Sequence, residues 1–226
     1  MRMPFELFVA LRYLFSRRKQ TFIYIISIMS ILGVALGVGA LVVVLGVYNG
    51  LTTDMRDKII GANAHGIVMS YVPAAFQQRP DLVRRVEAVE HVRGATPFIY
   101  TEVMLSAAGG VKGLVLRGID PESAPRVLSM LREIRRGSVA GLKREGTPGI
   151  VIGEELAKRL GIGLGSRVNL LSPSGEKGAT GYSPRIRPFE VVGIFKTGMF
   201  EYDSSLGFIS LAAARDLLGL PSDQIS

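Results

Sequence analysis

The sequence predicts a membrane-anchored α+β protein, with one N-terminal transmembrane helix and a mixed α/β core domain after it. Three observations support this fold class. Residues 21–47 include no charged residue. The rest of the chain mixes segments of two-residue alternation, typical of strands, with segments of helical periodicity. Elsewhere no run of about 18 apolar residues occurs, so we expect a single membrane crossing.

The uncharged run is long enough to cross a bilayer. As a helix it would extend about 40 Å, compared with roughly 30 Å for a hydrocarbon core. A cleaved signal peptide is the alternative, but its apolar part usually has about 7 to 15 residues and ends at a small-x-small cleavage site. Here the run is longer and leads into Tyr48, Asn49 and Gly50. We therefore expect a permanent anchor.

The charges that flank the run predict its orientation. The basic residues before it are Arg2, Arg12, Arg17, Arg18 and Lys19. After it, Arg56 and Lys58 are accompanied by Asp54 and Asp57. Because basic residues favour the cytoplasmic side, the N-terminus should be cytoplasmic. The chain beyond about Tyr48 would then lie outside the cytoplasm, which for a bacterial inner membrane is the periplasm.

The domains follow from these boundaries. Residues 1–19 should be a cytoplasmic interfacial helix, with Phe5, Phe8 and Phe15 on its apolar side, unless they simply extend the span. Residues 20–60 should be the transmembrane helix and a periplasmic stalk, ended by Gly61. Residues 61–226 should be a periplasmic core domain, incomplete at its C-terminus.

Two sets of residues on the long helix are candidate contact sites. Gly33 and Gly37 are four residues apart, a spacing that lets two membrane helices approach closely, although glycine is common in membrane helices in any case. Farther along, one face carries four large apolar side chains: Val44, Val47, Leu51 and Met55. This face could contact lipid or acyl chains, or pack on a neighbouring helix.

The first half of the core domain should contain strands and two helices. We expect a strand at 66–71 and a hairpin of strands 98–107 and 111–119, because Gly109 and Gly110 between them can adopt positive φ. Pro80 suits the first position of a helix at 81–90, whose Leu82, Val83 and Val86 lie on one face. Asp120 followed by Pro121 predicts a helix that continues to about residue 134.

The second half should continue this alternation after a loop at 137–149. The expected strands are 150–152, 167–171, 189–195 and 206–210. The expected helices are 154–160 and 211–218, the second capped by Ser210. Between two of the strands, residues 172–188 form a polar segment rich in Gly and Pro.

Composition and motifs give no indication of chemistry in this chain. The formal net charge is +8, of which residues 1–19 supply +4, and the other +4 is spread over the rest of the chain. No basic patch with interleaved aromatics indicates nucleic-acid binding. There is no Cys, and His65 and His91 are isolated, so we expect no metal site. The sequence lacks a phosphate-binding loop and the common hydrolase motifs. We therefore expect a non-catalytic protein without a cofactor.

Several motifs, in order, resemble a known family. They are LRYL at 11–14, RRK at 17–19, SILGVALGV at 30–38, NG at 49–50, VIGEELA at 151–157 and FEVVGIF at 189–195. The set is similar to the permease subunits of the lipoprotein-releasing ABC transporter, of the LolC/LolE type, and covers essentially the whole chain. The wider group includes the MacB-type exporters and FtsX. The segment FKTGMFEYDSSLGFI at 195–209 favours the lipoprotein-releasing branch.

The resemblance implies a transporter subunit of the bacterial inner membrane. In that family two permeases, identical or paralogous, hold a lipoprotein between membrane helices. A separate cytoplasmic ATPase subunit, LolD-like, drives periplasmic domains that pass the lipoprotein to a soluble LolA-like carrier. Full members continue into further spans, so we expect this sequence to be a fragment or truncated product.

The resemblance also implies a carrier-binding hairpin, the hook, at residues 172–188. Its expected contact residues are Thr180, Gly181, Tyr182, Ser183, Pro184 and Arg185. An extended, Pro-containing segment with a Tyr anchor, and with Arg185 and Arg187 nearby, is suited to docking by strand addition or aromatic insertion. A mobile hairpin without a partner is the alternative.

Other functions remain open at this point. A MacB-like exporter permease would move peptides or drugs, and an FtsX-like scaffold would regulate cell-wall hydrolases. An anchored enzyme would require turnover by the exterior domain. Which lipoproteins are handled does not follow from the sequence.

Overall fold

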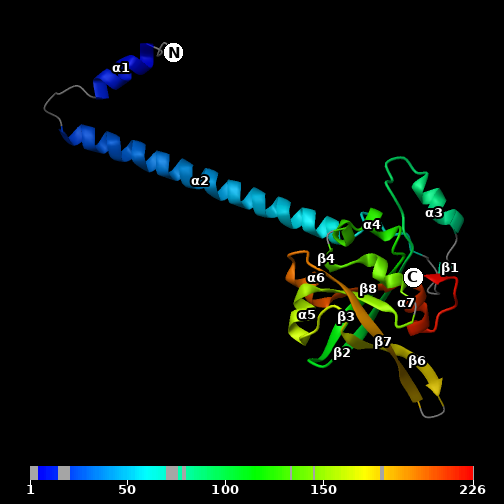
Figure 1. Cartoon of the computed structure of the whole chain (residues 1–226). Coiled ribbons are helices and arrows are strands. Elements are labelled where there is room, and N and C mark those ends of the chain that lie inside the picture. Colours follow the sequence, from blue (N-terminus) through cyan, green and yellow to red (C-terminus); the bar gives the residue numbers. More distant parts are fainter. Residues whose placement is uncertain are drawn as a thin grey trace. The chain divides into compact units, whose positions relative to one another are not determined.

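The computed structural model describes residues 5–14, 21–69, 76–77, 80–132, 134–144, 146–178 and 181–225. The chain divides into two compact units, Met1–Met55 and Arg56–Ser226. The first unit contains helix α1 (Phe5–Leu14) and most of helix α2 (Thr21–Ala62). Helix α2 has 42 residues and is continuous, so the expected span and stalk form one element (Figure 1).

Helix α2 ends one residue beyond the predicted stop at Gly61. Gly61 is closely packed, because a Cβ at this position would lie 2.9 Å from the Ser129 hydroxyl oxygen. That hydroxyl donates to the Gly61 carbonyl at 3.3 Å. The glycine therefore permits a close contact within the last turn of α2.

The second unit is built on a mixed sheet that closes on itself. Its strands are β2 (Phe98–Ala107), β3 (Gly110–Ile119), β4 (Ile134–Gly137), β5 (Gly149–Gly153), β6 (Arg167–Gly178), β7 (Gly181–Phe195) and β8 (Leu206–Ser210). Within the described residues their order is β4-β7-β5-β8-β3-β2-β6, and β7 also pairs with β6. The first half of β7 pairs with β6 and its second half with β5 and β4, which closes a ring.

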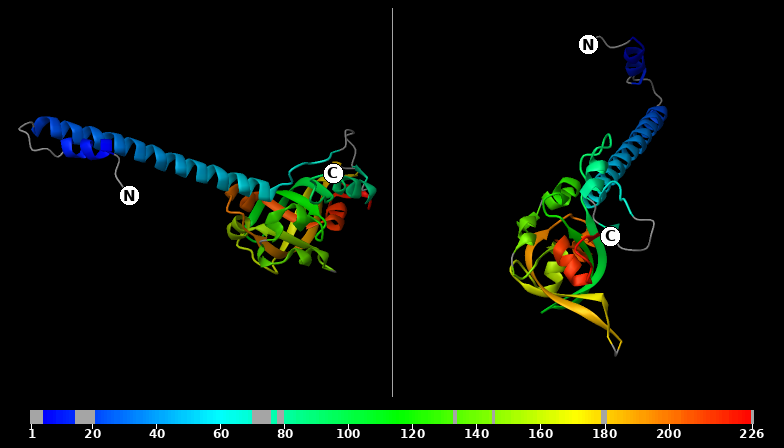
Figure 2. Two further views of the ribbon diagram at one scale, coloured as in Figure 1. Left: turned by 90° about the horizontal axis from the view of Figure 1, so that it is seen from above. Right: turned by 90° about the vertical axis from the view of Figure 1, so that its right-hand side faces the viewer.

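Short helices surround this ring. They are α3 (Pro80–Glu87), α4 (Ala124–Val127), the 3₁₀ helices η1 (Ser129–Arg132) and η2 (Val139–Lys143), α5 (Glu154–Leu160), α6 (Phe200–Ser205) and α7 (Leu211–Leu218). Two short strands, β1 (Phe76–Gln77) and β9 (Gln224–Ile225), pair with each other. In the right-hand view of Figure 2, α7 lies across the opening of the ring.

Strand β5 separates two hydrophobic cores. All five of its residues are buried. Ile150 and Ile152 belong to a core that includes side chains from α5 and α7. Val151, which points to the opposite face, belongs to a second core with residues from α4, η1 and η2. The Phe195 and Phe208 rings meet edge to face in that second core, with centroids 5.6 Å apart.

Many of the predicted elements are confirmed. The 98–119 hairpin, the strands at 150–152 and 206–210, and helices α5 and α7 lie where the sequence places them. The Ser210 hydroxyl accepts from the Ala213 N–H at 3.2 Å, as expected for an N-cap. Helix α3 begins at Pro80 but ends at Glu87, three residues early.

Two predictions are wrong. Residues 66–69 of the expected strand 66–71 are not in a strand, and residues 70–71 lie outside the described residues. The helix predicted at 120–134 is replaced by α4 and η1, because Leu128 adopts an extended conformation with ψ of 100°. The segment 172–188 forms the expected hairpin, in which β6 continues to Gly178 and β7 begins at Gly181, so these strands are longer than the predicted 167–171 and 189–195.

Candidate functional site

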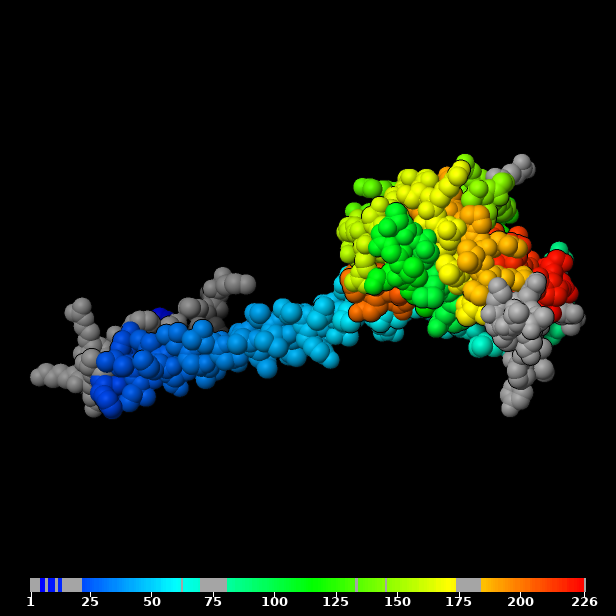
Figure 3. All heavy atoms as spheres, turned by 90° about the horizontal axis from the view of Figure 1, so that it is seen from below, coloured from blue at the N-terminus to red at the C-terminus, as the bar shows by residue number. Residues whose placement is uncertain are grey.

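The middle of helix α2 exposes an apolar surface. Among the described residues, one helix, within Phe22–Gly61, is long and apolar enough to cross a membrane. Val44, Val47, Leu51 and Met55 are 64, 66, 58 and 48% exposed. On the face shown in Figure 3 this part of α2 is uncovered. The arrangement suits contact with lipid or with another apolar helix.

The two predicted packing glycines lie on an open face of α2. A Cβ added at Gly33 or Gly37 would have no atom within 4 Å other than the neighbouring helix backbone. Within the described residues these two positions are therefore open, and their packing against a second helix stays a prediction.

The segment predicted as a hook is a long antiparallel arm. Arg167 to Ser172 of β6 pair with Arg185 to Glu190 of β7, and after a register shift the pairing resumes. The outer pairs are Glu176 with Ser183, Lys177 with Tyr182, and Gly178 with Gly181. Thr180 lies outside the described residues. The backbone of Gly181, Tyr182 and Ser183 is therefore placed near the tip of an extended hairpin.

Arg185 occupies a different position from the rest of the predicted hook. One of its guanidinium nitrogens donates to the Asp216 carbonyl at 3.5 Å. Arg187, two residues farther along β7, donates through Nε to the Asp216 carboxylate at 2.8 Å. Both arginines thus lie at the C-terminal end of α7, where positive charge is favourable. They anchor the base of the arm to the core domain.

The end of α2 is joined to the core domain by a hydrogen-bond network that sequence reasoning missed. Arg117 Nη2 on β3 donates to Asn63 Oδ1 at 2.8 Å. Asn63 Nδ2 donates to the Tyr202 hydroxyl of α6, also at 2.8 Å. Burial lowers the pKa of the Arg117 guanidinium. Asn63 thus links the residues just after α2 to two distant parts of the chain.

A buried carboxylate holds the turn beside Tyr202. Asp203 is 2% exposed. Its two oxygens accept from the Thr197 N–H at 2.8 Å, the Thr197 hydroxyl at 2.9 Å and the Gly198 N–H at 3.1 Å. These bonds fix residues 197–203, part of the segment that favoured the lipoprotein-releasing branch. The sequence offered no local signal for this role, because Asp is usually exposed.

The described part of the chain contains no group of three His, Cys, Asp or Glu side chains that could hold a metal ion. What the geometry defines is a long apolar helix, a candidate membrane span, that leads into a closed mixed sheet with an extended arm. Residues 27–225 match the model of the MacB-like periplasmic core domain. The chain belongs to this family.

The individual relatives that the chain matches have more specific names than the domain family. The chain is 32% identical to "Lipoprotein-releasing system transmembrane protein LolC" of Neisseria meningitidis, over 96% of this chain and 52% of that protein. It is 25% identical to the corresponding protein LolE of Haemophilus influenzae, over 100% of this chain and 54% of that protein. The chain spans about half the length of these curated relatives.

Among solved structures, the periplasmic region of MacB from Actinobacillus actinomycetemcomitans is similar, with a TM-score of 0.45 and 14% identity. That match covers 67% of this chain and 63% of the MacB chain.

Proposed function

We propose that this chain is part of a permease subunit of an ABC transporter that extracts lipoproteins from the bacterial inner membrane and transfers them to a periplasmic carrier. The observation that carries the proposal is the similarity to the LolC protein over 96% of the chain. In this proposal the chain is not an enzyme. ATP is hydrolysed by a separate cytoplasmic ATPase subunit, and a second permease, a copy or a paralogue, completes the membrane part.

The exposed face of α2 is proposed to contact the acyl chains of the lipoprotein. Its four apolar side chains follow helical spacing over about three turns, so they form one continuous strip. Each methylene of an acyl chain that the strip shields from water contributes about 0.8 kcal/mol, so a strip of this kind can hold a chain outside the bilayer without any polar contact. Gly33 and Gly37 are proposed to pack against the second permease.

The hairpin arm is proposed to bind the carrier. Its outer pairs lie beyond the part of β6 that pairs with β2, so the arm extends from the closed ring. Backbone N–H and C=O groups along such an arm can pair with a strand of the partner. Tyr182 and Pro184 would supply side-chain contacts, whereas Arg185 and Arg187 would hold the base of the arm.

Photocrosslinking tests this function directly. A photoreactive amino acid at position 182 of the full chain, in cells that express the complete transporter, should crosslink to the periplasmic carrier. A second at position 47 should crosslink to a lipoprotein. The matched control is position 169, an exposed residue on the ring part of β6, which should give neither product.

A separate pull-down of the carrier tests a loss-of-function variant. Tyr182→Ala combined with Pro184→Ala should weaken carrier binding by about tenfold or more, the loss typical of a central aromatic contact. The circular dichroism spectrum should not change. Undiminished carrier binding would remove the hook assignment, and crosslinks to a hydrolase activator in place of the carrier would contradict the transport function.

A further inference from the structure

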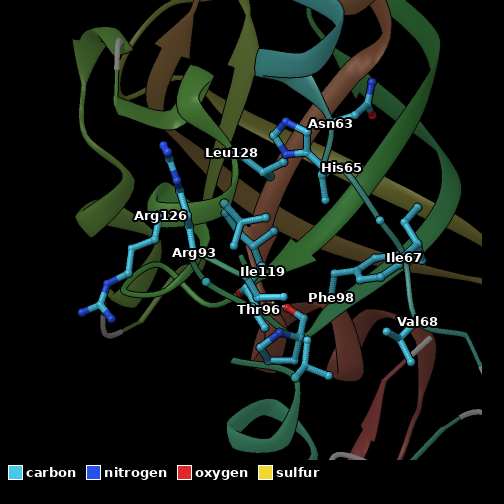
Figure 4. A pocket seen from close by; sticks show the side chains of 18 of the residues that line it. Asn63, His65, Ile67, Val68, Arg93, Thr96, Phe98, Ile119, Arg126 and Leu128 are labelled. Atoms are coloured by element: carbon cyan, nitrogen blue, oxygen red, sulfur yellow. Dashed lines mark hydrogen bonds between the residues drawn. The ribbon is translucent and has the colours of Figure 1, made fainter. Parts of the chain in front are cut away.

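A large apolar cavity lies in the second unit, between the residues that follow α2 and helices α3 and α4. Its volume is about 1040 Å³. Ligand pockets commonly measure about 300 to 1,000 Å³, so this cavity has room for a molecule at least as large as a typical cofactor. Figure 4 shows its interior. Asn63 and Arg117 of the hydrogen-bond network also line it, whereas the apolar face of α2 at 44–55 and the hairpin arm do not.

One wall of the cavity is apolar. Helix α3 contributes Leu82, Val83 and Val86, which lie on its inner face. The other apolar side chains of the lining include Ile60, Ile67, Val68, Phe98, Ile119 and Leu128. Ile67 and Val68 are 61 and 60% exposed, so this wall is only partly covered by the described chain. An apolar concave surface of this size is typical of a ligand site.

The opposite side of the cavity carries arginines from three separate elements. Arg93 follows α3, Arg126 belongs to α4 and Arg132 to η1, and all three line the cavity. They are exposed, and within the described residues none of them has an ion-pair partner. Figure 4 shows Arg93 and Arg126 on one side, with Ile67, Val68 and Phe98 on the other.

Arg93 and Arg126 come from neighbouring stretches of backbone. A Cβ at Gly94 would lie 3.6 Å from Arg126 Cβ, so the residue next to Arg93 packs directly on α4. Among the described lining residues, Asp57 alone is acidic. The arginine side of the cavity therefore has a net positive charge that the lining does not neutralise.

We propose that this cavity binds one anionic lipid molecule, with its acyl chain along the apolar wall and its phosphate on the side that carries Arg93, Arg126 and Arg132. Guanidinium groups bind phosphate oxygens in a two-pronged geometry that suits this headgroup. A free phosphate would leave the apolar wall uncovered, and an apolar peptide would leave three arginines unpaired. The site is distinct from the membrane-facing strip of α2 and does not depend on the transport function.

Photolabelling of the full chain in phosphatidylcholine nanodiscs tests the proposal. The probe is lysophosphatidylglycerol with a diazirine in its acyl chain, and the labelled peptides are identified by mass spectrometry. We expect label in segments that line the cavity, 60–68, 82–98 and 119–128. Lysophosphatidylcholine with the same diazirine should label these segments much less, and inorganic phosphate should not displace the label.

Two variants separate the headgroup from the acyl chain. Arg93→Gln with Arg126→Gln should reduce cavity labelling by about tenfold or more, because charge-assisted bonds are lost. The matched control, Arg135→Gln with Arg136→Gln, changes two exposed arginines outside the cavity and should not reduce it. Val86→Trp should reduce labelling by both probes, because it fills the apolar wall.

Three results would overturn the proposal. Label confined to residues 22–55 would place the lipid only in the bilayer. Equal labelling by the two probes would remove the role of the negative headgroup. Full displacement by inorganic phosphate would show an anion site that has no use for an acyl chain.

Discussion

Asn63 is the residue through which the end of α2 is held on the core domain. Its amide accepts from Arg117 and donates to Tyr202, and Nδ2 also lies 3.3 Å from the Ile59 carbonyl of α2. An Asn amide can satisfy several partners at once because it has two donors and two acceptor lone pairs. A side chain of this kind can fix the direction in which the chain leaves a helix.

Asn63→Ala should therefore weaken the core domain. The change removes two hydrogen bonds of 2.8 Å, to Tyr202 and from Arg117. Because the Arg117 guanidinium is already partly desolvated, its loss of a partner is costly, and we expect the free energy of unfolding to fall by about 1 to 3 kcal/mol. Thermal unfolding of the full chain in detergent, followed by near-ultraviolet circular dichroism, measures it.

Asn169→Ala is the matched control for this prediction. Asn169 is exposed on β6, at a distance in sequence from the α2 joint, and its loss should cost little. If the two variants lowered the melting temperature equally, the network around Asn63 would have no special role in stability.

At the scale of single elements, strong local signals gave correct predictions. Helix α5 begins with two acidic residues, ends in basic ones, and its C-cap, Gly161, adopts φ of 63°. Helix α7 has a Ser N-cap and Gly219 at its C-cap, with φ of 67°. These signals act within one or two turns, so they are visible in the sequence and are little affected by tertiary contacts.

The helix predicted at 120–134 shows where local signals fail. Asp120 does accept bonds from the Ser123 N–H and hydroxyl, as an N-terminal cap would. After Val127, however, Leu128, Met130 and Leu131 are drawn into the second core, where they are at most 8% exposed. Burial of these side chains outweighs helix propensity, which amounts to less than about 1 kcal/mol per residue.

The same Asp120 turn gives stability that depends on pH. Partial burial would raise the pKa of Asp120, but bonds from the Ser123 hydroxyl and from the Glu122 and Ser123 N–H groups lower it below its ordinary value. A lowered folded-state pKa means that the carboxylate stabilises the fold above its ordinary pKa. That contribution is lost as the pH falls through the lowered value.

Ser123→Ala should destabilise the domain most at neutral pH. The variant loses the hydrogen bond of 2.7 Å from the Ser123 hydroxyl to Asp120, so the pKa of Asp120 rises. Because the lost bond stabilises only the ionised carboxylate, the difference in stability between the variant and the native chain shrinks as the pH falls below about 4. Urea unfolding at several pH values measures this difference. Ser138→Ala removes a comparable cap at η2, and its cost should not follow the titration of Asp120. A cost of Ser123→Ala that was independent of pH would refute the argument.

At the scale of the whole molecule, the closure of the sheet could not be predicted from the sequence. Strand β7 pairs with three strands along its length, and β3 pairs in parallel with β8, about 90 residues later in the chain. Such pairings have no local signature, because any two strands of similar pattern could form them. The hairpin of β2 and β3 was predictable because its partners are adjacent in sequence.

The candidate contact residues also divide into those that could be predicted from the sequence and those that could not. The apolar face of α2 and the hairpin arm could be predicted, because each is formed by one continuous segment of the chain. The joint at Asn63 and the arginine side of the cavity were missed because their members come from separate elements. Asn63 and Tyr202 are 139 residues apart, so only the folded chain brings them together.

The orientation in the membrane can be tested on the whole chain because the sequence contains no Cys. A single introduced thiol then reports its own side of the membrane. Lys112→Cys on exposed β3 should react with a membrane-impermeant maleimide added to spheroplasts, because the basic residues before α2 favour a cytoplasmic N-terminus. Tyr13→Cys on α1 should react only after the membrane is permeabilised. Its labelling on a chain of full mass would also show that α2 is not removed as a signal peptide. If Tyr13→Cys reacted first and Lys112→Cys only after permeabilisation, the core domain would lie in the cytoplasm, where neither the exposed arm nor the strip on α2 could serve a periplasmic carrier.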